Sequence, residues 1–214
     1  MKEKVFVIAS MVVTLSVALL AAKFHWGYTS AFALAFGMFG ILAIYAWYKK
    51  DVFLRHLLAF GLAAGFLELF ADNWLVNTIQ SLVYPAEEPK IWASPNYMPF
   101  AWAVVLVQVG YLGYLFSKKH SMVKAMMLSF VIGMCFIPLF ETFAKYAGWW
   151  YYHPTRMIGN TPLYIILGEG MICFTLPFIY HKSIRHKLLW SILAGAIQGL
   201  WIWGAYYIAY RIVP

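Results

Sequence analysis

Five charged side chains lie inside long apolar runs or at their ends, where each needs a chemical or a structural reason. They are Glu68, Asp72, Glu141, Lys145 and Glu169. A charged group inside a membrane-length segment is unfavourable, and it is usually either functional or paired with another polar group. Carboxyl groups in apolar surroundings can store and deliver protons, so acid–base chemistry is the first chemistry that these residues suggest.

The spacing of the first four of these residues divides them into two pairs. Glu68 and Asp72 are four residues apart, so they share one face of a helix. Two like charges cannot both ionise cheaply in a low dielectric, and we expect one of the two carboxyls to keep its proton and act as a donor. Glu141 and Lys145 have the same spacing in the favourable order for an ion pair. That pair is either a structural salt bridge or part of the site.

Glu169 and two glutamines occur a few turns into apolar runs. Glu169 lies between two glycines, each of which costs about 1 kcal/mol relative to Ala in a helix. The glycines indicate either close approach of a neighbouring helix or room for a substrate beside the carboxyl. Gln108 occupies a comparable place, and we assign it to substrate binding. Gln198 is more typical of an interhelical hydrogen bond.

The composition requires a lipid environment. The chain of 214 residues is 64% hydrophobic, 20% aromatic and 11% charged, whereas soluble domains are nearer one half apolar and one quarter charged. The net charge of +8 comes from short basic clusters between apolar runs. This is the pattern of membrane topology, so we expect a lipid bilayer and no nucleic acid as partner.

Seven apolar runs are long enough to cross a membrane as helices. They lie near residues 5–22, 31–48, 53–78, 99–117, 122–147, 162–180 and 188–210. We therefore predict an all-α polytopic membrane protein with seven transmembrane helices, forming one integral membrane domain over residues 1–214. The first run could be a signal peptide, but its length favours a retained helix.

The basic residues predict the orientation. Most of the 16 Lys and Arg residues fall on one side of these spans. This group is Lys2, Lys4, Lys49, Lys50, Arg55, Lys118, Lys119, Lys124, Lys182, Arg185 and Lys187. The positive-inside rule makes that side cytoplasmic, with the N-terminus inside and the C-terminus outside. We expect the bacterial inner membrane as the location.

Two aromatic-rich loops, residues 79–98 and 148–161, connect spans on the other side. They predict either an aromatic belt at the membrane interface or a lid over an outward cavity. Each loop follows a similar segment, Glu68-Leu-Phe-Ala-Asp72 or Glu141-Thr-Phe-Ala-Lys145, and each ends near a Pro, Pro99 or Pro162. We infer an internal repeat, in which helices 3–4 and 5–6 are two copies of one hairpin. The seam between repeats is a common place for a membrane binding site.

Other kinds of site have weaker support in the sequence. Cys135 and Cys173 both lie in apolar runs and are typical of buried small hydrophobes. The Glu-x-x-His spacing of di-iron bundles does not occur, and neither does the Gly-x-Ser-x-Gly motif. We therefore predict no metal and no cofactor.

A resemblance agrees with the acid chemistry. The segment from Gly148 to Pro162, GWWYYHPTRMIGNTP, resembles part of the small integral-membrane carotenoid cyclases and hydratases of the lycopene cyclase domain type. Glu141 matches the first acidic residue of that pattern, and Trp150, Tyr152, Gly159 and Pro162 match the elements that follow. The family has two acidic residues shortly after the Pro, whereas this chain has Leu163 and Tyr164 there and its Glu only at 169.

We therefore expect an enzyme that protonates a lipophilic isoprenoid and so cyclises or hydrates it. The expected catalytic residues are Glu68, Asp72, Glu141 and Glu169. The expected substrate-binding residues are Trp150, Tyr151, Tyr152, His153, Asn73, Gln108, Lys145 and Trp102. The alternative is a transporter or binding protein for a small solute, with these carboxylates in an outward acidic vestibule. A third possibility is a structural protein in which the charges join helices.

Overall fold

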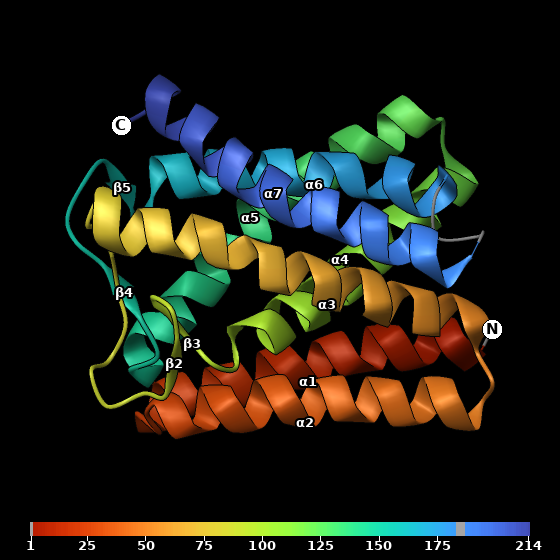
Figure 1. Ribbon diagram of the computed structural model, residues 1–214, viewed down its shortest axis with the longest axis horizontal. Helices are drawn as coiled ribbons and strands as arrows, with labels where there is room; N and C mark the ends of the chain where they lie inside the picture. The colour runs from red at the N-terminus through yellow and green to blue at the C-terminus, as the bar shows by residue number, and fades with distance from the viewer. Residues whose placement is uncertain (1, 183–186) are drawn as a thin grey trace.

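The computed structural model describes residues 2–182 and 187–214, and in these ranges seven helices are long and apolar enough to cross a membrane. They are α1 (Lys2–Phe24), α2 (Tyr28–Tyr48), α3 (Val52–Asn73), α4 (Met98–Lys119), α5 (Met122–Ala147), α6 (Leu163–Lys182) and α7 (Leu188–Ile212). A short π-helical turn, η1 (Trp74–Thr78), extends α3. The predicted all-α membrane architecture is confirmed, and Figure 1 shows the helices running along the long axis of the molecule.

Local sequence signals set several helix ends. The Asp51 carboxylate accepts a hydrogen bond from the Leu54 amide and caps α3, and the Ser121 hydroxyl does the same for the Lys124 amide in α5. Gly148 ends α5 with a φ of 75°, the left-handed conformation that glycine adopts at little cost.

The two ends of the bundle differ in composition. The end where the chain starts holds the connections α2–α3 and α4–α5, the last turn of α6 and the first turn of α7. The described members of the basic group lie there too. We call this the basic end; Arg185 lies outside the described residues. The long connections α3–α4 and α5–α6 lie at the opposite end, which we call the loop end (Figure 1).

The two long connections are built alike, which supports the predicted repeat. The first contains β1 (Leu82–Val83), β2 (Lys90–Ile91) and β3 (Ser94–Pro95), and the second contains β4 (Tyr151–Tyr152), β5 (Met157–Ile158) and β6 (Thr161–Pro162). In each, the second and third strands form a two-residue hairpin. The first loop residue has almost the same left-handed φ in both copies, 62° at Trp92 and 63° at Gly159.

This register changes one detail of the repeat inferred from the sequence. Pro95, not Pro99, is the equivalent of Pro162, because Pro95 pairs with Lys90 in the first hairpin as Pro162 pairs with Met157 in the second. Counting onward from these prolines, Trp102 of α4 occupies the place that Glu169 occupies in α6, and Gln108 does not.

In each helix pair, the two helices come into close contact at a glycine. A Cβ on Gly61 of α3 would lie 2.8 Å from the backbone oxygen of Ala103 in α4. A Cβ on Gly133 of α5 would lie 2.5 Å from the backbone oxygen of Glu169 in α6. Absence of a side chain therefore lets both hairpins pack backbone against backbone, as small residues do in membrane bundles. Outside these pairs, α7 packs on α3 and α1 packs on α5.

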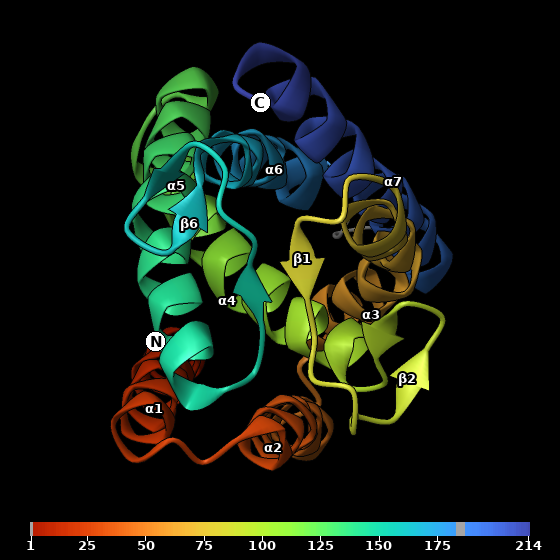
Figure 2. The same cartoon turned by 90° about the vertical axis from the view of Figure 1, so that its left-hand side faces the viewer.

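The two copies meet at the loop end. Strand β1 pairs antiparallel with β4, so that Leu82 faces Tyr152 and Val83 faces Tyr151. Figure 2 shows these two strands side by side across the middle of the bundle end. The pairing ties the two loops into one cover over the seam between the copies.

Candidate functional site

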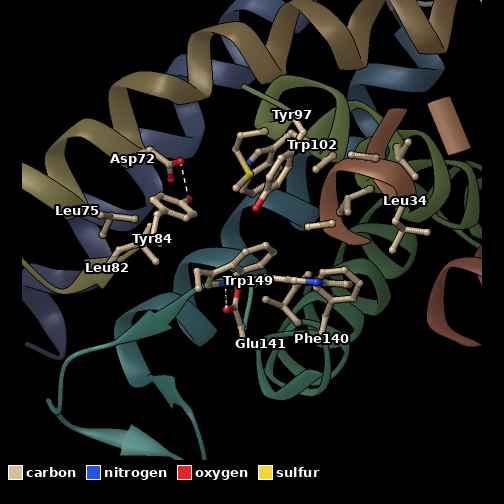
Figure 3. Close-up of a pocket in the computed structure, with 18 of the residues that line it drawn as sticks. Leu34, Asp72, Leu75, Leu82, Tyr84, Tyr97, Trp102, Phe140, Glu141 and Trp149 are labelled. Atoms are coloured by element: carbon tan, nitrogen blue, oxygen red, sulfur yellow. Dashed lines mark hydrogen bonds between the residues drawn. The ribbon is translucent and has the colours of Figure 1, made fainter. Parts of the chain in front are cut away.

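A cavity of about 100 Å³ lies beneath this cover, lined by residues from both loops and from α1 to α7. Its charged lining residues are Asp72 from α3, Glu141 from α5 and Glu169 from α6. The described lining contains no Lys, Arg or His side chain. Figure 3 shows Asp72 and Glu141 on different walls, with the aromatic side chains between them. The seam thus brings together three of the four acidic residues predicted from the sequence.

Each of the three lining carboxyls accepts a hydrogen bond from an aromatic side chain. The Tyr84 hydroxyl donates to Asp72 Oδ2 at 2.7 Å, and the Trp150 indole Nε1 donates to Glu141 Oε2 at 2.6 Å. The Tyr206 hydroxyl of α7 donates to Glu169 Oε1 at 2.5 Å. These contacts fix the direction of each carboxyl, as hydrogen bonds to ionisable side chains are strong and short.

Glu68, the fourth predicted acid, lies one turn below Asp72 and is completely buried. Neither of its carboxyl oxygens has a hydrogen-bond partner among the described residues, and it is not among the residues that line the cavity. The Asp72 carboxyl and the Trp102 indole are polar groups facing it. Glu68 and Asp72 therefore form the adjacent pair that their spacing predicts.

Aromatic rings form most of the remaining wall. The Trp150 ring lies 5.9 Å from Trp149, 6.3 Å from Phe140 and 6.3 Å from Tyr84, measured between ring centres. Trp149 is held in place because its indole donates to the Ser30 hydroxyl of α2 at 2.8 Å. The cavity is therefore apolar and rich in π-electron faces, with acidic groups at fixed points.

The loop tyrosines stay neutral near the acids. Burial, followed by the neighbouring Asp72 carboxyl, raises the pKa of Tyr84 well above its ordinary value. Burial and then Glu141 raise the pKa of Tyr152 in the same way. Because both hydroxyls keep their protons, they can act as hydrogen-bond donors at the cavity throughout the physiological pH range.

The glycines beside Glu169 are explained by packing. Gly168 leaves space for the Tyr206 ring, which lies directly against it, and Gly170 contacts Met134 and Phe130. Close packing therefore accounts for both glycines, while the Glu169 carboxyl itself lines the cavity. The packing at Gly168 brings the Tyr206 hydroxyl to the carboxyl.

Two glutamines join helices. Gln108 donates to the hydroxyls of Ser10 and Thr14 on α1, at 3.1 and 3.0 Å, and it does not line the cavity. Gln198 of α7 donates to the Ile172 carbonyl and accepts from Thr175, both on α6. The interhelical role predicted for Gln198 is confirmed, and Gln108 has the same role at a second helix contact.

Several predicted binding residues lie away from the cavity. The ion pair expected between Glu141 and Lys145 does not form: Lys145 is exposed and donates to Asn160 Oδ1 at 2.9 Å. Tyr151 and His153 are exposed on the loop surface, and Asn73 accepts from Asn77 at the loop end. Trp102, Trp150 and Tyr152 do line the cavity. Lys145 lies one helical turn beyond Glu141 and is directed toward Asn160 of the second loop.

Sequence reasoning missed Tyr84, Trp149 and Tyr206 as parts of the site. Tyr206 is eight residues after Gln198, and this spacing places both on one helix face. That was a usable signal for a buried tyrosine. Tyr84 and Trp149 carried no comparable signal, because their positions depend on the pairing of β1 with β4 and on the contact with Ser30.

A metal site of three or more ligands does not occur among residues 2–182 and 187–214, where no three His, Cys, Asp or Glu side chains are grouped to hold an ion. The carboxyls of the cavity are instead held singly by aromatic donors. Their arrangement suits proton transfer to or from a bound molecule, or attraction of a positive charge.

Comparisons with known proteins give a family. No curated protein and no solved structure matches the chain. Residues 69–213, more than half of the chain, match a family described as a domain of unknown function, DUF6989. The match includes Asp72, Glu141 and Glu169, the three carboxyls of the cavity. The chain belongs to the DUF6989 family.

Proposed function

We propose that the protein is a membrane-embedded enzyme that protonates a lipophilic isoprenoid and so starts its cyclisation or hydration. One observation carries the proposal: three carboxyls, each oriented by an aromatic donor, face a single cavity with aromatic walls. Acid groups, an apolar binding space and π faces are the requirements for making and guiding a carbocation.

The pair of Asp72 and Glu68 supplies the proton in this mechanism. Two adjacent carboxyls in low dielectric cannot both be ionised cheaply, so the pair holds a proton to deliver. The π electrons of a substrate double bond take the proton from Asp72, which leaves a carboxylate and a tertiary carbocation. Tyr84 then stabilises the new carboxylate through its hydrogen bond.

The aromatic wall stabilises the carbocation, and the carboxylate of a second acidic residue completes the reaction. Trp149, Trp150 and Phe140 present ring faces that attract positive charge. Attack by a second double bond of the substrate closes a ring and moves the cation. The carboxylate of Glu141 or Glu169 then accepts a proton from the adjacent carbon to form an alkene, or directs a water to the cation to give an alcohol.

The size of the cavity limits which part of a substrate enters it. Its volume of about 100 Å³ is below the roughly 150 Å³ of an engineered cavity that binds benzene. It therefore holds the end group of an isoprenoid chain and leaves the rest outside. A reaction at a terminal double bond follows from this limit.

The test is a search for product in cells. The chain would be expressed in strains that make linear isoprenoids of different lengths, and lipid extracts would be compared with those from strains with Glu141→Gln or Glu169→Gln. The proposal expects a new cyclic or hydroxylated isoprenoid that disappears in both variants while the protein remains in the membrane at normal amounts. Unchanged lipids in every strain contradict it.

The second candidate is a binding or transport protein for a small cation. The specific observation in its favour is that the lining combines three carboxyls with aromatic faces and, in the described residues, lacks a basic side chain. A cavity lined in this way also attracts organic ammonium ions. Uptake or binding of tetramethylammonium that is lost in Asp72→Asn, together with unchanged lipids, favours this candidate over the enzyme.

We propose the bacterial inner membrane as the location, with the basic end in the cytoplasm and the loop end outside. The positive-inside rule supports this orientation. Single cysteines at the exposed Glu87 and Tyr151, in a Cys135→Ser, Cys173→Ser background, would react with an impermeant maleimide in intact cells. Labelling only after lysis would reverse the orientation.

A further inference from the structure

A buried carboxyl outside the cavity, Glu88, has no role in the mechanism above. It lies in the first loop between the exposed Glu87 and Pro89, yet its side chain is only 4% exposed. Neither of its oxygens has a hydrogen-bond partner among the described residues. Buried polar groups nearly always have partners, so an unpaired carboxyl in a loop needs an explanation.

Glu88 faces the wall of the cavity. The polar group opposite its carboxyl is the hydroxyl of Tyr97, which stands at the start of α4, lines the cavity and also lacks a hydrogen-bond partner. The other charged groups near Glu88 are Glu87 and Lys90 of the same loop, and both are exposed. Glu88 therefore connects the loop surface with Tyr97.

The same line of polar groups continues to the acid pair. Tyr97 also lies near Asp72, and the hydroxyl of Ser94, in β3, faces the Asp72 carboxyl. Ser94 is fully buried and its hydroxyl is unpaired, as are the carboxyl oxygens of Glu68 beyond Asp72. Unpaired donors or acceptors thus occur at Glu88, Tyr97, Ser94 and Glu68, each near Asp72 or near another member of this group. Such a group can bind water and pass protons between its members.

We propose that Glu88 is the proton inlet of the acid pair, a positioning residue that takes protons from the medium at the loop end and passes them by way of Tyr97 to Asp72. This inference rests on the proposed function. Each turnover leaves Asp72 as a carboxylate, and the proton lost later goes to Glu141 or Glu169 on other helices. Asp72 must therefore be recharged, and the loop cover separates it from bulk water.

The transfer balances without any further reactant. The Glu88 carboxylic acid gives its proton to the Tyr97 hydroxyl oxygen, directly or through water, as the Tyr97 hydroxyl proton passes on toward the Asp72 carboxylate. Glu88 becomes a carboxylate and takes a new proton from the medium. Tyr97 ends each transfer in its starting state.

The ionisation of Glu88 suits this role. Burial raises its pKa from 4.5 to about 7, while Tyr97 and Lys90 oppose part of that increase. A group that titrates near neutral pH both accepts and releases protons readily. Because the inlet delivers from the protonated form, turnover falls as pH rises through about 7.

The experiment compares Glu88→Gln with Glu87→Gln, which removes a neighbouring but exposed carboxylate. Turnover of squalene, lycopene or geranylgeraniol by the full chain in lipid would be followed against pH. Glu88→Gln is expected to slow turnover roughly 10- to 100-fold, at or below the lower end of the range for a positioned acid. It should also abolish the fall near pH 7, and formate should restore turnover; Glu87→Gln should match the wild type.

A slow Glu88→Gln variant that keeps the wild-type pH profile and does not respond to formate would overturn the inlet and leave Glu88 a structural role. Normal turnover of Glu88→Gln would overturn it as well.

A readout without substrate separates this inference from the proposed function. Infrared spectra after transfer into D₂O report how fast the acid pair exchanges its proton, with the band assigned by its loss in Asp72→Asn. Glu88→Gln should slow that exchange at least about tenfold, in line with the turnover effect. Unchanged exchange contradicts the inlet even if the enzyme is active. Absence of product from every isoprenoid, with exchange that depends on Glu88, contradicts only the proposed function.

Discussion

The two hairpin copies share one backbone plan but carry their acids differently. In the α3–α4 copy both acids lie on the first helix, one turn apart, and Trp102 stands on the second helix. In the α5–α6 copy Glu141 is on the first helix and Glu169 takes the place of Trp102 on the second. One copy therefore holds an adjacent acid pair, and the other holds two separated acids, each with its own aromatic donor. The difference suggests that the first copy supplies protons and the second receives them.

The largest effect is expected where the copies differ most, at Asp72 and Lys145. Asp72→Asn removes the proposed proton donor and should reduce product formation by roughly 10²- to 10⁴-fold, the range for a positioned acid. Lys145→Gln changes the corresponding residue of the other copy, which faces outward onto Asn160, and should leave the rate within about twofold. Rates measured with purified protein in lipid check both. Equal losses of rate in the two variants would contradict the assignment of proton supply to the first copy alone.

The two acids of the second copy should affect the product more than the first step. Glu141→Gln and Glu169→Gln remove candidate proton acceptors, so we expect about tenfold to 100-fold slower turnover and a changed ratio of alkene to alcohol. Chromatography of the products with mass spectrometry measures this ratio. A variant of either residue that loses activity as completely as Asp72→Asn, with no change in products, would assign proton supply to the second copy.

A smaller effect is expected from the donors that orient the acids. Tyr206→Phe removes the hydrogen bond to Glu169 and leaves a buried acceptor unpaired, which costs about 1–3 kcal/mol. That corresponds to roughly 5- to 150-fold in rate. Tyr207→Phe is the matched control, because Tyr207 is exposed and contacts only the rings of Trp74 and Trp203 among the aromatic pairs described. Similar rates for the two variants would show that Glu169 needs no such orientation.

The smallest effect tests the packing that both copies share. Gly133→Ala places a Cβ 2.5 Å from the Glu169 carbonyl oxygen and 2.8 Å from Cys173 Sγ, so α5 and α6 must separate. Overpacking of this kind costs about 1–3 kcal/mol, which should lower the melting temperature in detergent. Gly40→Ala is the control, because the space beside Gly40 is open, and Ala there should raise helix stability by up to about 1 kcal/mol. A melting temperature that is unchanged in Gly133→Ala would show that the hairpin tolerates separation.

The sequence was sufficient for the architecture and for most of the acids. Apolar run lengths located the helices, and the Glu-x-Phe-Ala motif located the repeat that brings Asp72 and Glu141 to one seam. The predicted equivalence of Pro99 and Pro162 was wrong, because Pro occurs at both 95 and 99, and only the pairing of β2 with β3 identifies Pro95 as the equivalent residue.

The hydrogen-bond partners of the acidic residues could not be predicted from the sequence. Spacing suggested Lys145 for Glu141, but the chain turns back at Gly148, and so the Trp150 indole reaches that carboxyl instead. The Tyr206 hydroxyl of α7 reaches Glu169 of α6 because Gly168 has no side chain to displace the Tyr206 ring. Contacts of this kind depend on tertiary packing, which a single sequence does not encode in any local pattern.

The central claim is that Asp72 delivers a proton to a carbon atom of an isoprenoid end group. The most direct test is turnover in D₂O of the isoprenoid found active, with the deuterium in the product located by mass spectrometry and NMR. The wild-type chain should give a product with one deuterium at its terminal unit, and Asp72→Asn should give no labelled product. Product without deuterium, or labelled product formed normally by Asp72→Asn, would contradict it.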